Sequence, residues 1–281
     1  MNRRSISSRK ATDLAVKVLS SLSAFIGIVA LAWILYEIMS RGASSLNYGF
    51  FTNPPTPPGM EGGGLGNAVL GTVLITALAT FMGVPVGLMA GVYLSEVGRK
   101  TRLASTVRFV ANMIMGVPSI IIGVFVYTLL VVTTGTFSGY AGATALALIM
   151  LPVVASTSED MLKLVPDTLR ESALALGAPH WKVTTGIVFR AAKTGLVTGV
   201  LLAVARVSGE TAPLLFTALN SPYWPKGLGE PTANLTVTIF NYAMSPYDDW
   251  QAMAWGASLV ITLGVLFLTI VARALLGGRS T

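Results

Sequence analysis

The sequence contains no cysteine and a single histidine, His180. Disulfides, thiolate metal sites and cysteine catalysis are therefore excluded, and so is a metal site built from several histidines. Charge is also scarce, since 11% of the 281 residues are Asp, Glu, Lys or Arg while 53% are hydrophobic. This balance, with a mean hydropathy of +0.71, excludes an ordinary soluble domain and predicts an integral membrane protein.

Long apolar runs predict an all-α polytopic membrane protein with six transmembrane helices. The first run is longer than the core of a signal peptide and has no small-x-small cleavage site, so we interpret it as a retained helix. The six predicted helices are Val18 to Met39, Asn67 to Leu94, Phe109 to Val132, Tyr140 to Val154, Thr194 to Ala218 and Met253 to Leu275.

These runs give an expected organisation of the chain. It comprises an N-terminal segment at 1–17, the first helix at 18–39, an external Pro- and Gly-rich loop at 40–66, a core of five helices at 67–276 that includes a cytoplasmic segment at 163–190 and an external loop at 219–251, and a tail at 277–281.

The basic residues lie almost entirely on one side of this topology, which predicts that side to be cytoplasmic. Only Arg41 and Lys226 fall in the loops of the opposite side. Both termini and segment 163–190 are therefore expected in the cytoplasm. The net charge of +7 follows from this arrangement, so no nucleic-acid partner is needed. The residues on the cytoplasmic side are Arg3, Arg4, Arg9, Lys10, Lys17, Arg99, Lys100, Arg102, Arg108, Lys163, Arg170, Lys182, Arg190, Lys193, Arg273 and Arg279.

The segment from Pro166 to Arg190 is the longest water-compatible interruption in the second half of the chain. Pro166 suits a first helical turn, and Gly177 suits the left-handed position that ends a helix. Pro179 cannot continue that helix, so a second element should begin near His180. The pattern predicts a short cytoplasmic helix, a turn and a return to the membrane.

This helix could simply lie on its neighbours, but its residues resemble the EAA loop of ABC importer permeases. Ser172 replaces the second position of that motif, and Phe189-Arg190 replaces its terminal Leu-Pro. The resemblance implies a coupling helix that docks into a cleft on a separate ATP-hydrolysing subunit. The matching residues and their neighbour, the expected coupling residues, are Arg170, Glu171, Ser172, Ala173 and Gly177. For Arg170, contact with the ATPase and a solvated cytoplasmic face are equally open.

Arg206 lies inside the predicted fifth helix, and Glu210 follows one turn later. Charged groups at this depth cost several kcal/mol unless they are paired or face a polar cavity. One interpretation is an i, i+4 ion pair that neutralises itself and pins neighbouring helices. In the other, the planar guanidinium of Arg206 binds a tetrahedral oxyanion.

The stretch Ser208 to Leu215, preceded by Arg206, resembles the signature of phosphate-specific ABC importer permeases of the PstA type. Residues Gly116 to Ile120 and Leu151 to Ala178 are similar to the same family, and the resemblance runs from about Asn67 to the end. It implies a type I ABC importer permease fold. It also implies a substrate pathway, to which we assign Arg206, Ser208, Glu210 and Thr211.

Glu210 suggests a basis for selectivity between anions. Phosphate at neutral pH keeps a proton that a carboxylate can accept, whereas sulfate has none.

One position departs from the family. Where the family has Arg-Thr-Thr-Glu after the fourth helix, this chain has Ser156-Thr157-Ser158-Glu159. Either that arginine is dispensable, or this copy has altered affinity, specificity or activity.

The resemblance further implies a division of labour in a bacterial inner membrane. The expected partners are a sister permease forming a heterodimer, two ATP-binding subunits, a phosphate-binding extracytoplasmic protein and membrane lipid. The chain has no G-x-x-x-x-G-K-S/T loop, so we expect no catalysis and no cofactor in it, with ATP and Mg bound by the partner ATPase.

Three other classes remain as alternatives. A permease for sulfate, molybdate or a phosphonate would share the EAA loop and the charge pattern. A secondary transporter would show two repeated halves, and no such repeat is visible. A membrane enzyme would need a polar catalytic set, whereas Ser119, Ser208 and Thr211 lie beside Pro or Gly in apolar helices, where hydroxyls mostly satisfy backbone carbonyls.

Overall fold

The computed structural model describes residues 6–60 and 62–277, and nearly all of them lie in helices, with no β-strand among them. The elements are α1 (Ile6–Gly42), η1 (Ala43–Ser45), α2 (Tyr48–Thr52), α3 (Gly66–Val92), η2 (Tyr93–Val97), α4 (Arg102–Gly116), α5 (Ser119–Val126), η3 (Tyr127–Val131), α6 (Val132–Thr134), α7 (Gly139–Lys163), α8 (Asp167–Ala175), α9 (His180–Val183), η4 (Thr184–Val188), α10 (Phe189–Ser208), α11 (Ala212–Thr217), α12 (Leu235–Ala243) and α13 (Asp248–Gly277). Of these, η1 is a 3₁₀ turn, whereas η2, η3 and η4 are π-helical.

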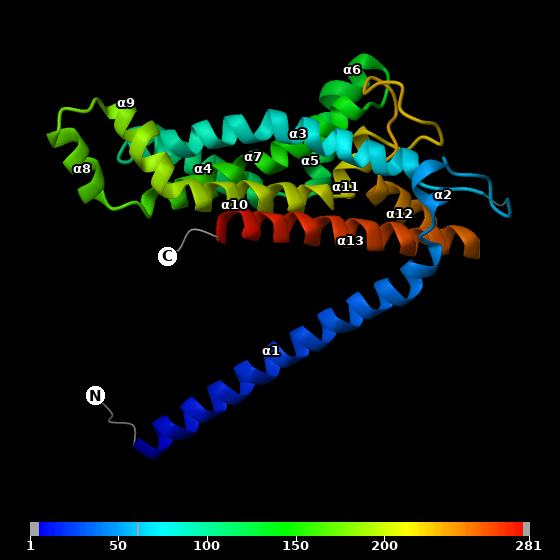
Figure 1. Cartoon of the computed structure of the whole chain (residues 1–281), viewed down its shortest axis with the longest axis horizontal. Coiled ribbons are helices and arrows are strands. Elements are labelled where there is room, and N and C mark those ends of the chain that lie inside the picture. The colour runs from blue at the N-terminus through cyan, green and yellow to red at the C-terminus, as the bar shows by residue number, and fades with distance from the viewer. Residues whose placement is uncertain (1–5, 61, 278–281) are drawn as a thin grey trace.

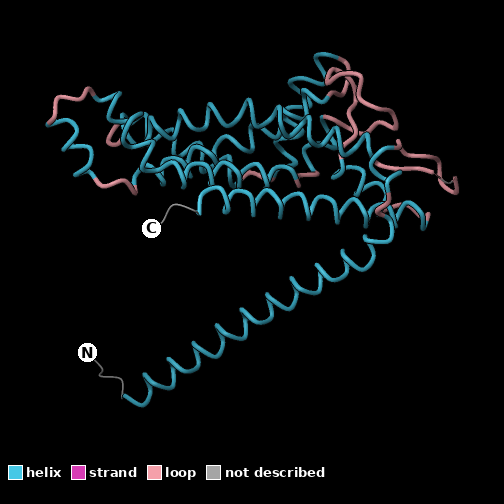
Figure 2. Tube along the Cα trace, in the orientation of Figure 1, coloured by secondary structure: helices cyan, strands magenta, loops and turns pink. Residues whose placement is uncertain are grey.

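The long helices run side by side in an elongated bundle (Figure 1), and α7 is its most buried member. The short helices α8 and α9 project from one end of the bundle, and most of the loops gather at the other end (Figure 2). Helix α1 leaves the bundle at an angle and touches α13 only near Gly42, where the Ser45 hydroxyl donates to the Ala252 carbonyl at 2.8 Å. Helix α1 begins, and α13 ends, toward the end of the bundle that carries α8.

Five helices are long and apolar enough to cross a membrane, and the pair α4 and α5 would make a sixth span. That pair is bent by 101°, so the span predicted over 109–132 is interrupted and is not one continuous helix. Pro118 explains the break, because a residue before proline is driven out of the helical region, and Val117 has an extended backbone with φ −75° and ψ 131°.

The predicted helix over 194–218 is also interrupted. Helix α10 ends at Ser208, and α11 begins at Ala212 with Pro213 in its first turn. Pro213 has no N–H to donate to the preceding turn, so one helix cannot run through this point. In contrast, α7 extends beyond the predicted limit of Val154 to Lys163.

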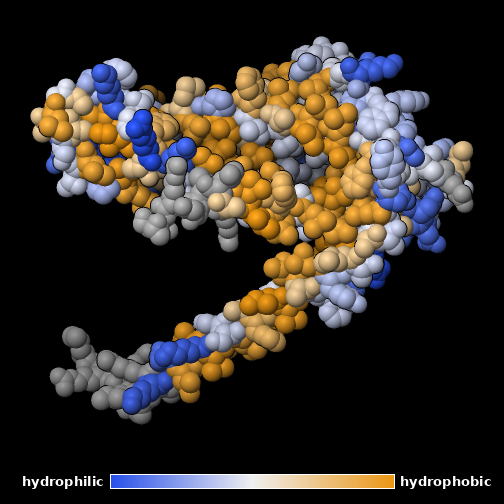
Figure 3. Space-filling view, viewed as in Figure 1, coloured by the Kyte–Doolittle hydropathy of each residue, from blue (hydrophilic) through white to orange (hydrophobic). Residues whose placement is uncertain are grey.

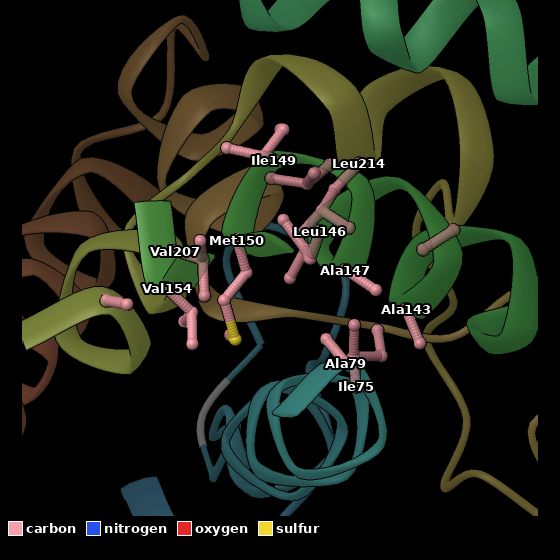
Figure 4. Packing of buried hydrophobic residues seen from close by; sticks show 13 residues of the cluster. Ile75, Ala79, Ala143, Leu146, Ala147, Ile149, Met150, Val154, Val207 and Leu214 are labelled. Atoms are coloured by element: carbon pink, nitrogen blue, oxygen red, sulfur yellow. The ribbon is translucent and has the colours of Figure 1, made fainter. Parts of the chain in front are cut away.

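A row of glycines on α3 allows close approach to α7. Gly83, Gly87 and Gly91 are one turn apart, and a Cβ added at Gly91 would lie 2.5 Å from the Ser158 Cβ. Small residues at such spacing let membrane helices approach along their backbones. Figure 4 shows the result, in which side chains of α3 and α7 interdigitate in the central core, together with Val207 of α10.

The outer surface of the bundle is apolar along its middle and polar toward its two ends (Figure 3). The middle of helix α1, from Val18 to Tyr36, is mostly apolar and exposed, with Phe25 63% and Trp33 67% exposed. Such a surface requires lipid or another membrane subunit around it. The predicted terminal segments fall partly outside the described residues, which omit 1–5 and 278–281.

Candidate substrate site and docking surface

The two helix breaks lie next to each other. Helix α5 packs against α11 through Gly123, where an added Cβ would lie 2.6 Å from the Pro213 Cα. This contact places the α4–α5 break beside the residues that follow α10. Interrupted helices are tolerated in a membrane where they line a cavity, and such breaks commonly form substrate sites.

A cavity of about 240 Å³ lies between the two breaks and the adjacent face of α7. Arg206 and Glu210 provide its charged groups, and Ser119 provides a hydroxyl. The remaining wall is apolar. The lining residues are Ile114, Met115, Val117, Pro118, Ser119, Ile122, Ile149, Val153, Arg206 and Glu210.

Arg206 is exposed to this cavity, and its side chain forms no ion pair or hydrogen bond within the described part of the chain. The self-neutralising pair with Glu210 is therefore absent, because α10 ends at Ser208 and Glu210 lies beyond the helix. The guanidinium keeps its donors free for a ligand. The N-terminus of α5, which carries partial positive charge, opens on the same cavity at Ser119. This arrangement favours an anion.

Backbone hydrogen bonds hold Glu210 at the cavity. Its N–H donates to the Val207 carbonyl at 3.1 Å, and its carbonyl accepts from the Thr236 hydroxyl at 3.1 Å. Thr236 lies in the first turn of α12, which Asn234 caps by accepting from the Val237 N–H, and the Thr236 hydroxyl also lies 3.0 Å from the Asn234 side-chain oxygen. The carboxylate and the guanidinium thus share one cavity without being bonded to each other.

The other two predicted pathway residues do not line this cavity. The Ser208 hydroxyl donates to the Ala205 carbonyl at 2.8 Å, and Ser208 borders a separate apolar groove between α3 and α13. Thr211 caps α11 without a side-chain capping bond. Sequence reasoning did not assign Ser119 to the site, although the Gly-Val-Pro-Ser motif around Pro118 carried the signal of a break.

Ser156 lies half-buried on α7, on the same face as the cavity residue Val153 and closer to α8. One turn further, the buried Glu159 accepts from Arg108 of α4 at 2.7 Å and from Lys163 at 2.5 Å. Ser156 thus lies one turn from a cluster in which Glu159 holds the basic side chains of Arg108 and Lys163.

The segment after α7 has the geometry that the sequence predicted. Helix α8 starts after Pro166, Gly177 has a left-handed φ of 81°, and α9 starts at His180. Ala173 is buried, whereas Glu171 and Ser172 are exposed. The apolar face around them is also open, with Leu169 45% and Leu176 89% exposed. Leu169 lies on α8 and Leu176 directly follows it, so this projecting segment presents two exposed leucines beside Glu171 and Ser172.

Arg170 is located beneath this surface and not on it. Its side chain is 10% exposed, and its guanidinium contacts Glu96 of η2 and Asp167 of α8. It also donates to the carbonyls of Leu162 and Val165 at the end of α7. Arg170 therefore anchors α8 to the bundle.

Comparison with known proteins gives consistent results. The family model described as "Binding-protein-dependent transport system inner membrane component" matches residues 83–277. The phosphate transport system permease protein PstA of Yersinia pestis is 47% identical over 267 residues, covering 95% of this chain and 90% of the relative. The protein of the same name from Haemophilus influenzae is 48% identical over 265 residues, covering 94% of each chain.

Solved structures share the fold at low sequence identity. A chain of the MetNI methionine ABC transporter in an inward-facing conformation has a TM-score of 0.62 and 20% identity, covering 76% of this chain and 95% of that one. A chain of a bacterial alginate ABC transporter, solved with an alginate-bound periplasmic protein, has a TM-score of 0.65 and 12% identity, covering 96% of each.

Proposed function

The chain belongs to the family of binding-protein-dependent transport system inner membrane components, and we propose that it is the permease subunit of an ATP-driven importer that carries inorganic phosphate into the cytoplasm. The membership makes it a multi-pass membrane protein with the fold of ABC importer permeases. The substrate is proposed from the relatives, which are named as phosphate permeases, and from the chemistry of the cavity.

The observation that carries the proposal is the unpaired guanidinium of Arg206 in a cavity between two broken helices. Its planar fork matches a tetrahedral oxyanion. The apolar wall lowers the local dielectric, which strengthens the attraction between the guanidinium and an anion. The N-terminus of α5 adds partial positive charge. Phosphate bound here would replace the water that Arg206 otherwise needs.

Glu210 supplies discrimination in this proposal. A carboxylate repels a fully ionised dianion such as sulfate. It can instead accept a hydrogen bond from the proton that phosphate retains. The Glu210 carboxylate is available for this role, because among the described residues it forms no ion pair with a basic side chain.

The remaining partners follow from the exposed surfaces. Glu171, Ser172 and Leu176 on the outer side of α8 would dock on one of two ATP-binding subunits, which would bind ATP and Mg. A sister permease would complete the pathway and cover part of the apolar surface. An extracytoplasmic protein would deliver phosphate. In this proposal both termini and α8 would lie in the cytoplasm, which the distribution of Lys and Arg supports.

A test would use the complete transporter reconstituted in vesicles with its binding protein and ATP. We expect uptake of labelled phosphate that depends on ATP and resists a large excess of sulfate, molybdate or methylphosphonate. Competition by one of these anions, with no phosphate uptake by an assembled complex, would show a permease for another oxyanion.

A further inference from the structure

The contact between α8 and the end of α3 is more elaborate than anchoring requires. The Arg170 Nε donates to Glu96 Oε2 at 3.1 Å, and its Nη2 donates to Glu96 Oε1 at 2.9 Å. This is the two-point fork that fixes the relative orientation of both groups. Both side chains are nearly buried, with exposures of 10% for Arg170 and 11% for Glu96.

Glu96 belongs to η2, the π-helical segment that continues α3. Such segments occur often at functional points of helices. The backbone of η2 is held from a second side, because the Leu94 carbonyl accepts from Arg108 Nη2 at 2.9 Å. Arg108 is on α4, and α4 leads to the break that lines the cavity.

Two side-chain contacts, joined by the backbones of η2 and α4, therefore connect α8 to the cavity. The connection passes from Arg170 on α8 to Glu96 on η2, from the Leu94 carbonyl to Arg108 on α4, and along α4 to Val117. The buried Glu159 ties Arg108 to α7 in the same layer. A displacement of α8 would act on one wall of the cavity through these contacts.

We propose that Arg170 and Glu96 are positioning residues whose ion pair transmits movement of α8 to η2 and thereby to the α4 wall of the cavity. The proposal rests on the proposed importer function and assigns the ion pair a role in linking ATP hydrolysis to transport. Neither residue lines the cavity at Arg206, and both side chains are nearly buried. Helix displacements at such interfaces are a common means of switching between states.

A purely structural ion pair would behave differently. Breaking it would lower the amount of folded complex, and hydrolysis and transport would fall together. Loss of transmission would instead lower the number of phosphate ions moved per ATP hydrolysed in complexes that are assembled. The transport-to-hydrolysis ratio therefore separates the two roles.

The experiment uses the purified complete transporter in vesicles with three variants, Glu96→Gln, Arg170→Lys and the double change. The first keeps the shape of Glu96, and the second keeps the charge of Arg170. The matched control is Lys100→Ala, which removes an exposed positive charge just after η2 whose side chain bonds to no other described residue.

Each single variant should lower the transport-to-hydrolysis ratio by about 2- to 30-fold, the range in which residues along a coupling route act. The double variant should be no worse than the poorer single one, because both remove the same contact. Lys100→Ala should keep the wild-type ratio. Wild-type ratios in assembled single variants, or fully additive losses in the double variant, would overturn the proposal.

A measurement on the unaltered ion pair covers the case in which the variants do not assemble. The chain has no native cysteine, so nitroxide labels can be attached at introduced cysteines alone. Labels at the exposed positions Ser172 and Val97 should keep their separation between the ATP-free and ATP-trapped transporter, while both move relative to a label at Phe267 on α13. A changed separation between Ser172 and Val97, or no movement relative to Phe267, would refute the link.

A wild-type complex that imports no phosphate would contradict the proposed function and not the ion-pair role, which can then be measured with whichever anion is imported. Phosphate import with unchanged coupling ratios in the variants would contradict the ion-pair role alone.

Discussion

Replacing Arg206 with alanine should weaken phosphate import without disturbing the fold. The side chain faces the cavity and bonds to no described residue, so its removal leaves no orphaned carboxylate and no broken helix contact. A hydrogen bond to a charged group contributes about 1.5–3 kcal/mol. Losing one such bond to the anion should raise the apparent KM for phosphate by about 10- to 100-fold.

Arg206→Lys provides a graded comparison, because lysine keeps the charge but loses the two-point fork. Its apparent KM should lie between those of the wild type and Arg206→Ala. Arg190→Ala is the matched control, since Arg190 is an exposed arginine on the same helix, α10, and does not line the cavity. The assay is initial-rate uptake of labelled phosphate at several concentrations, normalised to the amount of assembled transporter.

The reasoning would be refuted if Arg206→Ala transported phosphate with a wild-type apparent KM and maximal rate. Failure of Arg206→Ala to assemble, with normal assembly of Arg190→Ala, would show that Arg206 supports the structure instead of the substrate. Equal losses in both variants would indicate a general effect of net charge.

Three further predictions concern selectivity, packing and the outer end of the bundle. Glu210→Gln should reduce the preference for phosphate over sulfate, because an amide no longer repels a dianion; an unchanged ratio in competition uptake would exclude this role. Gly91→Ala should destabilise the chain by about 1–3 kcal/mol, because its Cβ would lie 2.5 Å from a side-chain carbon of α7. Gly264→Ala is the control and should not destabilise the chain, because an added Cβ there would have no neighbour within 4 Å. Thermal denaturation in detergent measures both effects. Burial raises the pKa of Tyr242 from 10.0 to about 12. The stability of the folded chain should therefore fall as pH rises through this interval, because the unfolded chain has already released the proton there. Tyr242→Phe should abolish this part of the pH dependence in the same assay.

Tyr242 illustrates how local structure outside the spans also depends on tertiary contacts. It stacks on Trp250 of α13 with ring centroids 4.4 Å apart, although the two residues belong to different helices. Trp250 is half-buried in the chain, so this stacked pair joins α12 to the first turn of α13.

The sequence alone determined the features that depend on local patterns. Runs of apolar residues predict membrane helices because length and hydropathy suffice to satisfy the bilayer. Gly177 and Pro179 predict the turn after α8, because their backbone limits act wherever they occur. The signature around Arg206 also predicted the family, which the comparisons confirm.

Only the tertiary structure decided which charged groups meet. Arg206 and Glu210 were assigned to one helix, but the break after Ser208 separates them and turns both to a cavity shared with the α4–α5 break. Arg170 bonds to Glu96, which lies far away in the sequence, so no local pattern could predict that ion pair. Proline signals that a helix can bend, yet whether it kinks or ends depends on the neighbours that complete its hydrogen bonding, and those neighbours are fixed by packing.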